Sequence, residues 1–248
     1  MGKVYVVGDV HGCIDEFKEL IDTIGASSDD RIVCLGDFMD KGPDGAACVK
    51  FARQSGLESV MGNHEERHIR WRKHELARAK TGKKNPMKHM SEQDQGNHKI
   101  LDDEDMAWIT GLPTTIDLGN GWVAAHAGFL PNISVADQHP NDVMRVRWVK
   151  DGKFLANDYS KPELILEQPE GATYWATQWT GPEHVVYGHE PFSLSTPKLT
   201  IHAGVQTWGI DTGVVHGGRL TALVLPTLEL VQIPARRKYC EVLVPIAP

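Results

Sequence analysis

The chain opens with short apolar segments separated by stretches in which apolar residues recur at helical spacing. Residues 4–7 (VYVV) and 31–35 (RIVCL) are rich in β-branched residues and each stops at a glycine, which predicts two buried strands. Residues 14–24 place apolar side chains three and four positions apart, which predicts a helix. A second helix is expected over 44–54 and a third strand over 58–61. Strands and helices that alternate in this order predict an α/β architecture.

From residue 64 to about residue 109 the strand pattern gives way to helices. Residues 64–80 predict one long amphipathic helix, which the segment TGKKNP at 81–86 interrupts. Residues 102–109 (DDEDMAWI) predict a second helix, because its acidic start suits the positive end of the helix dipole. We therefore expect a helical cap insertion over about 64–109, within a single domain that covers residues 1–248.

Strands return in the second half of the chain. Two apolar runs, 121–125 (GWVAA) and 185–187 (VVY), predict buried strands, whereas 132–180 has no clear period. The final third carries four short apolar segments that glycine and proline separate, which predicts an antiparallel meander. These segments are 200–203, 207–210, 220–225 and 228–233.

In five places an apolar strand stops at or just before a glycine, and polar residues follow. The five segments are GDVHG (8–12), GDFMDKG (36–42), GNHE (62–65), HAG (126–128) and GHE (188–190). Side chains at neighbouring strand ends converge, because paired strands lie only about 4.8 Å apart. The converging set holds two Asp, one Asn and several His, which are oxygen and nitrogen ligands. Such a set suits Mn²⁺, Fe, Co or Zn²⁺ rather than Ca²⁺ or a zinc–thiolate site.

Each of these segments also has an ordinary structural explanation. Asp9 and His11 could form a capped turn, Asp37 could cap a helix, and His126 and His189 could be hydrogen-bonded core histidines. Buried polar groups that stay unpaired would each cost a few kcal/mol. Because all five segments coincide at strand ends, one metal centre explains them together better than five separate structural roles.

In this order, the five segments resemble the signature motifs of the PPP-type (phosphoprotein-phosphatase) branch of the calcineurin-like metallophosphoesterases. The resemblance runs from residue 8 to residue 190. It implies an α/β/β/α sandwich, a dinuclear metal site, and hydrolysis by attack of a metal-bridging hydroxide on phosphorus. Two divalent ions are therefore expected, Mn²⁺ first, with Co²⁺, Zn²⁺ or Fe as alternatives.

The resemblance also assigns roles to individual residues. The implied metal ligands are Asp9, His11, Asp37, Asn63, His126 and His189. Asp37 matches the carboxylate that bridges the two ions, with Asp9 and His11 on the first ion and the other three on the second. His64 matches the proton donor to the leaving oxygen, and Asp40 matches the carboxylate that orients it.

Two positions depart from the familiar protein phosphatases of this branch. Lys41 stands where they have Arg after the second aspartate of the motif, and Met61 stands where they have Arg before Gly-Asn-His. Arg binds phosphate oxygens in pairs, whereas Lys is a point charge on a flexible stem. The contacts to the phosphoryl oxygens must therefore differ from those in the protein phosphatases.

The Lys-Gly-Pro variant resembles the diadenosine-tetraphosphatase-like (ApaH-like) phosphatases. Residues 209–213 (GIDTG) and 216–226 (HGGRLTALVLP) extend this resemblance toward the C-terminus. In that group a downstream Arg contacts phosphate, which implies Arg147 here, with Arg145 as the alternative.

A basic segment follows the proton-donor position. Residues 67–88 carry nine Lys or Arg and one acid, a net charge of +8, which leaves −15 on the rest of the chain. A charge run is commonly a solvated helix face, but beside His64 it would also attract a polyanion, with Arg70 and Lys73 as substrate contacts. His68 lies one helical turn after His64, the spacing of a zinc pair. Because the resemblance gives His64 another role, His68 is expected to be structural.

Composition sets outer bounds on the function. A net charge of −7 argues against a general DNA binder, and no apolar run approaches the roughly 18 residues that a membrane span needs. The four cysteines form no CxxC pair and no secretion signal opens the chain, so reduced thiols and a cytoplasmic location are expected.

These observations predict a metal-dependent phosphohydrolase that acts on polyanionic phosphate esters or anhydrides. Its substrate would be a dinucleoside polyphosphate such as diadenosine tetraphosphate, a polyphosphate, or a capped RNA end. The alternative is a Ser/Thr phosphoprotein phosphatase, against which Lys41 and Met61 count. A non-catalytic phosphate-binding module would have lost a ligand or His64, and none is lost.

Overall fold

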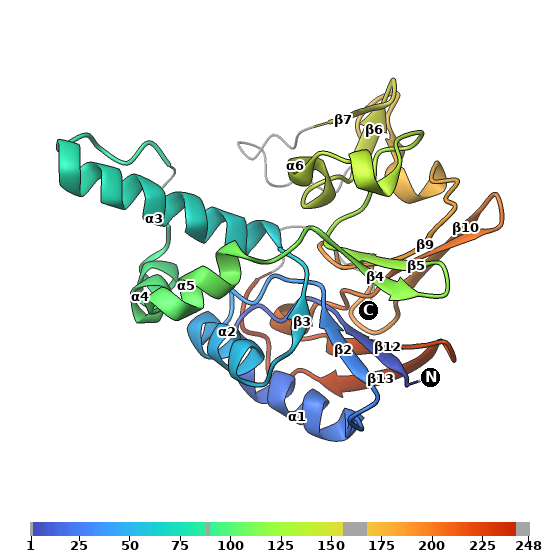
Figure 1. The fold of residues 1–248 in the computed structure, drawn as a ribbon, viewed down its shortest axis with the longest axis horizontal. Helices are drawn as coiled ribbons and strands as arrows, with labels where there is room; N and C mark the ends of the chain where they lie inside the picture. The colour runs from blue at the N-terminus through green and yellow to red at the C-terminus, as the bar shows by residue number, and fades with distance from the viewer. Residues whose placement is uncertain (1, 88–89, 156–167, 242–248) are drawn as a thin grey trace.

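The computed structural model describes residues 2–87, 90–155 and 168–241, and it is built on two five-stranded mixed sheets (Figure 1). The first sheet has, in spatial order, β13 (Glu229–Pro234), β12 (Arg219–Leu225), β1 (Val4–Val7), β2 (Arg31–Cys34) and β3 (Glu58–Ser59). β1 and β2 are parallel, and Val7 pairs with Cys34. The loops that follow these two strands therefore leave the sheet at the same edge.

The second sheet faces the first. Its order is β10 (Lys198–His202), β11 (Val205–Gly209), β9 (His184–Tyr187), β5 (Trp122–Ala125) and β4 (Thr115–Gly119). β5 and β9 are parallel, and Ala125 pairs with Tyr187, so His126 and Gly188 also leave at one edge.

The meander predicted for the final third is wrong, although its four strands exist. β10 and β11 form one antiparallel hairpin and β12 and β13 another, but the two hairpins belong to different sheets. β11 pairs in parallel with β9, and β12 pairs with β1 at the other end of the chain. Apolar patterning identifies strands, but it carries no information on which partner a strand finds.

Side chains point alternately to the two faces of each strand, and the two faces belong to different hydrophobic cores. In β1, Val4 and Val6 face the second sheet, whereas Tyr5 and Val7 face helices α1 (Ile14–Ile24) and α2 (Gly45–Gln54). This alternation follows from the two-residue period of a strand. The predicted sandwich is therefore confirmed, with α1 and α2 as one outer layer.

The outer layer over the second sheet contains little helix. It combines α6 (Pro140–Val143) with a three-stranded sheet of order β7 (Lys153–Phe154), β6 (Trp148–Lys150) and β8 (Thr173–Tyr174). Trp175 and Trp179 fill the core between this layer and the sheet. Three single-turn 3-10 helices complete the described chain: η1 (Val135–Asp137), η3 (Trp175–Thr177) and η4 (Val214–His216).

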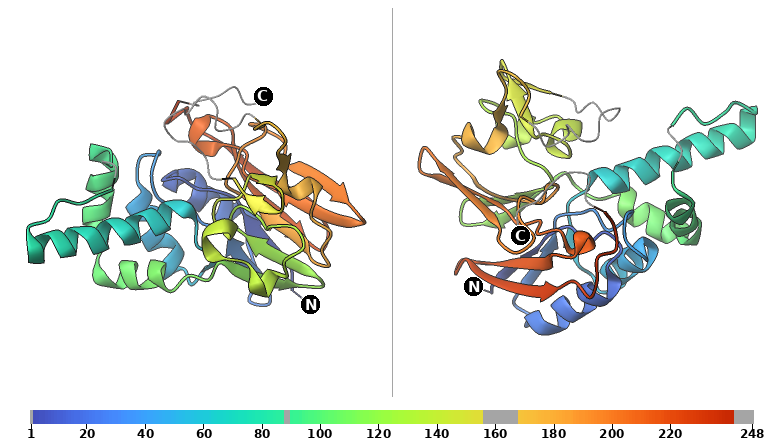
Figure 2. Two further views of the ribbon diagram at one scale, coloured as in Figure 1. Left: turned by 90° about the horizontal axis from the view of Figure 1, so that it is seen from above. Right: turned by 180° about the vertical axis from the view of Figure 1, so that it is seen from behind.

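Three helices occupy the region where a cap was expected. They are α3 (Asn63–Thr81), α4 (Glu92–Ile100) and α5 (Asp103–Thr110). Figures 1 and 2 show α3 projecting away from the sheets, with α4 and α5 beside it. α4 was not predicted, because its sequence EQDQGNHKI has one apolar residue and therefore no apolar face. Among the described residues, no helix is both long and apolar enough to cross a bilayer.

A buried carboxylate connects the cap helices to the body of the protein. Asp105 of α5 is fully buried and accepts hydrogen bonds from Lys50 and Arg53 of α2, the latter at 2.9 Å. It also accepts the backbone N–H of Asp102 at 3.1 Å, which completes a capping box at the start of α5.

We expect Asp105→Ala to lower the free energy of unfolding by about 1–3 kcal/mol, because two cations and one N–H lose a buried acceptor. The two cations reach solvent, which keeps the loss below that of a fully buried pair. Urea denaturation measures the change. Asp103→Ala is the control, since Asp103 pairs with Arg72 at the surface and should shift stability by less than about 0.5 kcal/mol. Equal effects of the two variants would contradict this role for Asp105.

Candidate metal centre

The five strand-end segments meet on one side of the two sheets. The structure brings together all eight residues that the motifs point to: Asp9, His11, Asp37, Asp40, Asn63, His64, His126 and His189. The segments after β1 and β2 come from one sheet, those after β5 and β9 come from the other, and α3 begins between them. Parallel pairing within each sheet creates this convergence.

The carboxylate of Asp37 lies at the middle of the cluster. Its Oδ2 is 3.4 Å from His126 Nε2, 3.6 Å from His11 Nε2 and 3.8 Å from His64 Nε2. Its Oδ1 accepts the backbone N–H of His64 at 3.0 Å. Two groups of ligand atoms share this residue: His11, Asp37 and His64 in one, and Asp37, His126 and His189 in the other. Within each group the atoms lie within 4.8 Å of one another.

The ionisation of Asp37 is coupled to that of its neighbours. Burial alone would raise the pKa of Asp37, but the imidazoles of His126 and His64 hold this pKa well below its usual range. In turn, burial would lower the pKa of His126, whereas the Asp37 carboxylate raises it to about 9. Asp37 therefore remains a carboxylate at neutral pH and presents charge to the centre.

Asp9 and Asp211 place a second concentration of negative charge beside Asp37. Both oxygens of Asp9 accept the backbone N–H of His189, at 3.1 and 3.0 Å. Burial and the Asp211 carboxylate together raise the pKa of Asp9 well above its usual range. A divalent cation between these carboxylates would relieve the repulsion and the desolvation cost. Asp211 lies two residues after β11, which ends at Gly209, so the strand-end signal could have identified it.

Ring nitrogens of the histidines face the same space. His126 Nδ1 donates to the carbonyl of Leu35 at 2.7 Å, and its Nε2 lies 3.0 Å from Asn63 Oδ1. His189 Nε2 is buried and has no hydrogen-bond partner among the described residues. Burial and the nearby Arg147 cation lower the pKa of His189. A neutral, buried and unpartnered imidazole nitrogen is a ready metal ligand.

His11 has a similar environment with one addition. Its Nδ1 bonds the carbonyl of Met39 at 3.0 Å, and Lys41 Nζ lies 2.8 Å from its Nε2. Burial and the Lys41 cation lower the pKa of His11 well below its usual value. The donor set of carboxylate, amide and imidazole groups around Asp37 therefore fits divalent metals such as Mn²⁺, Fe, Co or Zn²⁺.

Glu65 fixes the loop that carries Asp37, a role that the motif comparison did not assign. Its Oε2 accepts the N–H of Asp37 at 2.7 Å and that of Gly62 at 3.2 Å. Its Oε1 accepts the N–H groups of Phe38 at 2.9 Å and Met39 at 3.1 Å. The sequence signal was available, because an acid three positions after an N-cap residue is half of a capping box.

The close approach of this loop to α3 also requires glycine at position 62. A Cβ on Gly62 would lie 2.2 Å from Asp37 Oδ1 and 2.4 Å from the Asp37 backbone nitrogen. Neither atom can move without disturbing the centre, so even Ala is excluded by contact.

His64 and Asp40 form a hydrogen-bonded pair at the edge of the centre. His64 Nδ1 lies 2.7 Å from Asp40 Oδ2, and the opposite ring nitrogen faces Asp37. Burial would raise the pKa of Asp40, but hydrogen bonds from His64 and His68 hold it well below its usual range. An ionised Asp40 can only accept this hydrogen bond, so the proton lies on His64 Nδ1 and Nε2 faces Asp37.

The residues expected to bind substrate have different surroundings in the structure. Arg147 is buried next to the His189 loop, with its Nε 3.5 Å from Glu190 Oε2. Its Nε and Nη1 have no hydrogen-bond partner among the described residues. Arg145 pairs with Glu66 of α3 at 2.5 Å.

Arg70 and Lys73 are less directly placed. Arg70 also pairs with Glu66, at 2.6 Å, and is half exposed. Lys73 lines a groove between α3 and α5, beside Ile69 and Met106. At 3.6 residues per turn, its nine-residue separation from His64 puts it on the opposite side of α3. The structure therefore does not bring Lys73 to the cluster.

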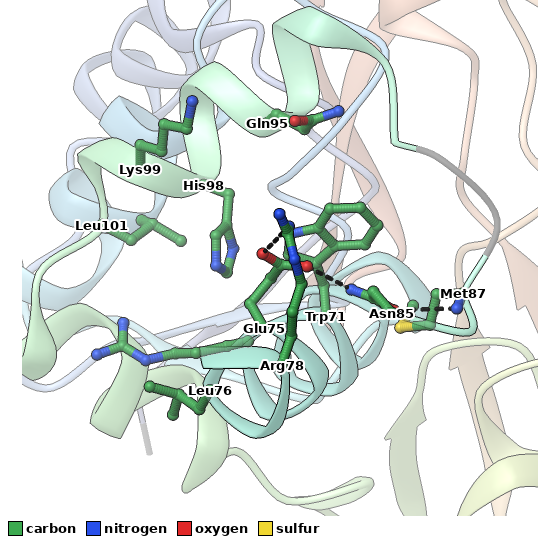
Figure 3. Close-up of a pocket in the computed structure, with 11 residues that line it drawn as sticks. Trp71, Glu75, Leu76, Arg78, Asn85, Met87, Gln95, His98, Lys99 and Leu101 are labelled. Carbon is green, nitrogen blue, oxygen red and sulfur yellow. Dashed lines mark hydrogen bonds and ion pairs between the residues drawn. The ribbon is translucent and has the colours of Figure 1, made fainter. Parts of the chain in front are cut away.

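A pocket of about 540 Å³ lies in the cap between α3, residues 85–87 and α4 (Figure 3). Its two arginines are engaged within the protein: Arg78 bonds Glu75, which also accepts from Asn85, and Arg72 pairs with Asp103. Of the basic segment, Lys88 lies outside the described residues, whereas Lys80, Lys83 and Lys84 are exposed.

Known proteins resemble this chain in sequence and in fold. Residues 2–193 match the family model for calcineurin-like phosphoesterases. A Bacillus subtilis protein named bis(5'-nucleosyl)-tetraphosphatase PrpE, asymmetrical, is 27% identical over 95% of this chain and 96% of its own.

Solved structures agree. A crystal structure of a protein proposed to be a diadenosine tetraphosphatase is 26% identical and covers 94% of each chain with a TM-score of 0.71. A Saccharomyces cerevisiae serine/threonine phosphatase shares the fold at 14% identity, with a TM-score of 0.51 over 95% of this chain and 80% of its own. The family match spans more than half of the sequence and includes every strand-end motif. The chain belongs to the calcineurin-like phosphoesterase family of metal-dependent hydrolases.

Proposed function

We propose that this hydrolase cleaves dinucleoside polyphosphates such as diadenosine tetraphosphate. The observation that carries the proposal is the pair of ligand groups that share Asp37, one of which includes His64, itself hydrogen-bonded to Asp40. The named activities of the B. subtilis relative and of the structural neighbour point to this substrate class. They support it rather than a capped RNA end or a long polyphosphate.

Two divalent ions, with Mn²⁺ preferred and Co²⁺, Zn²⁺ or Fe as alternatives, would occupy the centre. Asp9 and His11 would hold one ion, Asn63, His126 and His189 would hold the other, and Asp37 would contact both. When bound, such ions act as Lewis acids on the phosphoryl oxygens and on water.

The protein's own groups orient the substrate and deliver a proton. His64 Nε2 gives its proton to the oxygen of the leaving group, while Asp40 holds Nδ1 and so fixes the ring. Lys41, Arg147 and Arg145 contact phosphate oxygens, and Arg70 and Lys73, with the basic segment, raise the local concentration of the polyanion. The free cysteines, three of them buried, fit a reducing compartment such as the cytoplasm.

A serine/threonine phosphoprotein phosphatase is the alternative. It would require a strong grip on one compact phosphate dianion, for which forked Arg donors are best suited. Here Lys41 lies against His11, and Met61 contributes an apolar side chain, its backbone N–H bonding the carbonyl of Pro113 at 2.7 Å. These two positions favour the anhydride substrate, whose additional phosphates bring charge beyond the scissile group.

Asp37→Asn should remove bound metal from both positions, because the amide lacks the charge that both ions need. Elemental analysis after loading with Mn²⁺ and dialysis measures the loss. Asp44→Asn is the control: Asp44 caps α2 by accepting the N–H of Ala47, and Asn caps a helix equally well. Two retained ions and a near-normal rate in Asp37→Asn would contradict the assignment.

His64→Asn should keep the metals and lower kcat by about 10²–10⁴, the usual contribution of a general acid. The loss should be smaller on 4-nitrophenyl phosphate than on phenyl phosphate, because nitrophenolate leaves without a proton. His74→Asn, on the same helix, is the control and should retain activity. Equal losses on both aryl phosphates would show that His64 is not the acid, and a loss of metal would make it a ligand.

The substrate class is tested by direct comparison. We expect kcat/KM for diadenosine tetraphosphate to exceed that for a phosphoserine peptide by at least about tenfold, which corresponds to ~1.4 kcal/mol in transition-state binding. Replacing Lys41 and Met61 with Arg should narrow the gap by improving the peptide. A wild-type preference for the peptide would replace the anhydride proposal with the protein-phosphatase alternative.

A further inference from the structure

The carboxylate of Asp40 is held by more than the proton donor. Its Oδ2 accepts from His64 Nδ1 at 2.7 Å and from Arg67 Nη1 at 3.1 Å, whereas its Oδ1 accepts from His68 Nε2 at 2.8 Å. All three donors come from the first turns of α3, at positions that share one helix face. His68 is therefore the group that fixes the second oxygen, and with it the plane of the carboxylate.

His68 is itself held by a residue from another helix. It is fully buried, and its Nδ1 lies 3.0 Å from Nδ1 of His98 in α4. The two rings are stacked, with centroids 5.2 Å apart. Figure 3 shows His98 pointing from α4 across the cap pocket toward α3.

The chemistry of this contact constrains both rings. Asp40 is ionised and can only accept, so His68 Nε2 must carry a proton. Two imidazole nitrogens form a hydrogen bond only when one has a proton and the other a lone pair. His98 therefore either donates to a neutral His68 or accepts from a protonated one, and in both cases it completes the bonding of His68.

We propose that His68 and His98 are positioning residues for the proton donor, acting in the order His98, His68, Asp40, His64. The inference rests on the proposed role of His64 and extends it to the cap, since α4 also places Asp94 3.8 Å from Arg67. Without His68, Asp40 Oδ1 loses its donor and the carboxylate can rotate. The His64 ring that this carboxylate holds can then turn, so that Nε2 no longer points at the leaving oxygen. Misplacement of a catalytic group by about 1 Å can cost on the order of 100-fold in rate.

His68→Phe keeps a ring in the buried site but removes both hydrogen bonds. We expect it to lower kcat for phenyl phosphate by about 10- to 100-fold, with a loss below about threefold on 4-nitrophenyl phosphate. KM and metal content should not change. His68→Gln, whose amide can donate to Asp40 and accept from His98, should recover most of the rate, and His98→Phe should show the same substrate dependence more weakly. His74→Phe is the matched control on α3.

A double variant that combines His68→Phe with His64→Asn distinguishes failure of the positioning role from failure of the proposed function. If His68 acts through His64, adding His68→Phe to His64→Asn should cause little further loss. Additive losses, equal losses of His68→Phe on both aryl phosphates, or no rescue by Gln would overturn the positioning role, while the proposed function stands. If His64→Asn itself lacks the leaving-group dependence, the proton donor is misassigned and the proposed function fails at that step. Thermal unfolding of each variant identifies any loss that comes from folding.

Discussion

The carboxylate of Glu65 accepts four backbone N–H groups from two segments, and the geometry of the centre depends on this contact. Three of the groups belong to residues 37–39, after β2, and the fourth belongs to Gly62 at the start of α3. The loop needs such support, because Asp37, Asp40 and Lys41 all adopt positive φ angles of 51°, 67° and 65°. Left-handed backbone at non-glycine residues is uncommon and persists only when surrounding contacts hold it. Glu65 thereby fixes the positions of Asp37, Asp40 and His64 relative to one another.

Charge is the second constraint. Asp9, Asp37 and Asp211 are buried close together, opposed by His126 and Lys41. A cluster of buried carboxylates is costly unless it is paired with cations. The cap contributes at the other side of His64, where His68 and Arg67 complete the bonding of Asp40. Centre and cap are thus joined through one helix, α3, which begins at Asn63 beside His126 and continues into the cap.

Much of this arrangement follows from the sequence, because it depends on local patterns. Apolar runs that end at glycines predict strands whose loops share an edge, and the parallel pairs β1–β2 and β5–β9 produce that edge. The partners of the C-terminal strands could not be predicted, since β1 pairs with β12 across most of the chain length. α4 could not be predicted either, because it has one apolar residue, contains Gly96, and depends on the Ser91 cap and on contacts with α2. No sequence pattern therefore pointed to His98, and His68 was expected only to be structural.

The most direct test of the account is anomalous diffraction from crystals grown with Mn²⁺. The account predicts two manganese peaks, both within bonding distance of the Asp37 carboxylate, one beside Asp9 and His11 and the other beside Asn63, His126 and His189. A single peak, or two peaks of which one lies away from Asp37, would contradict a centre organised around this carboxylate.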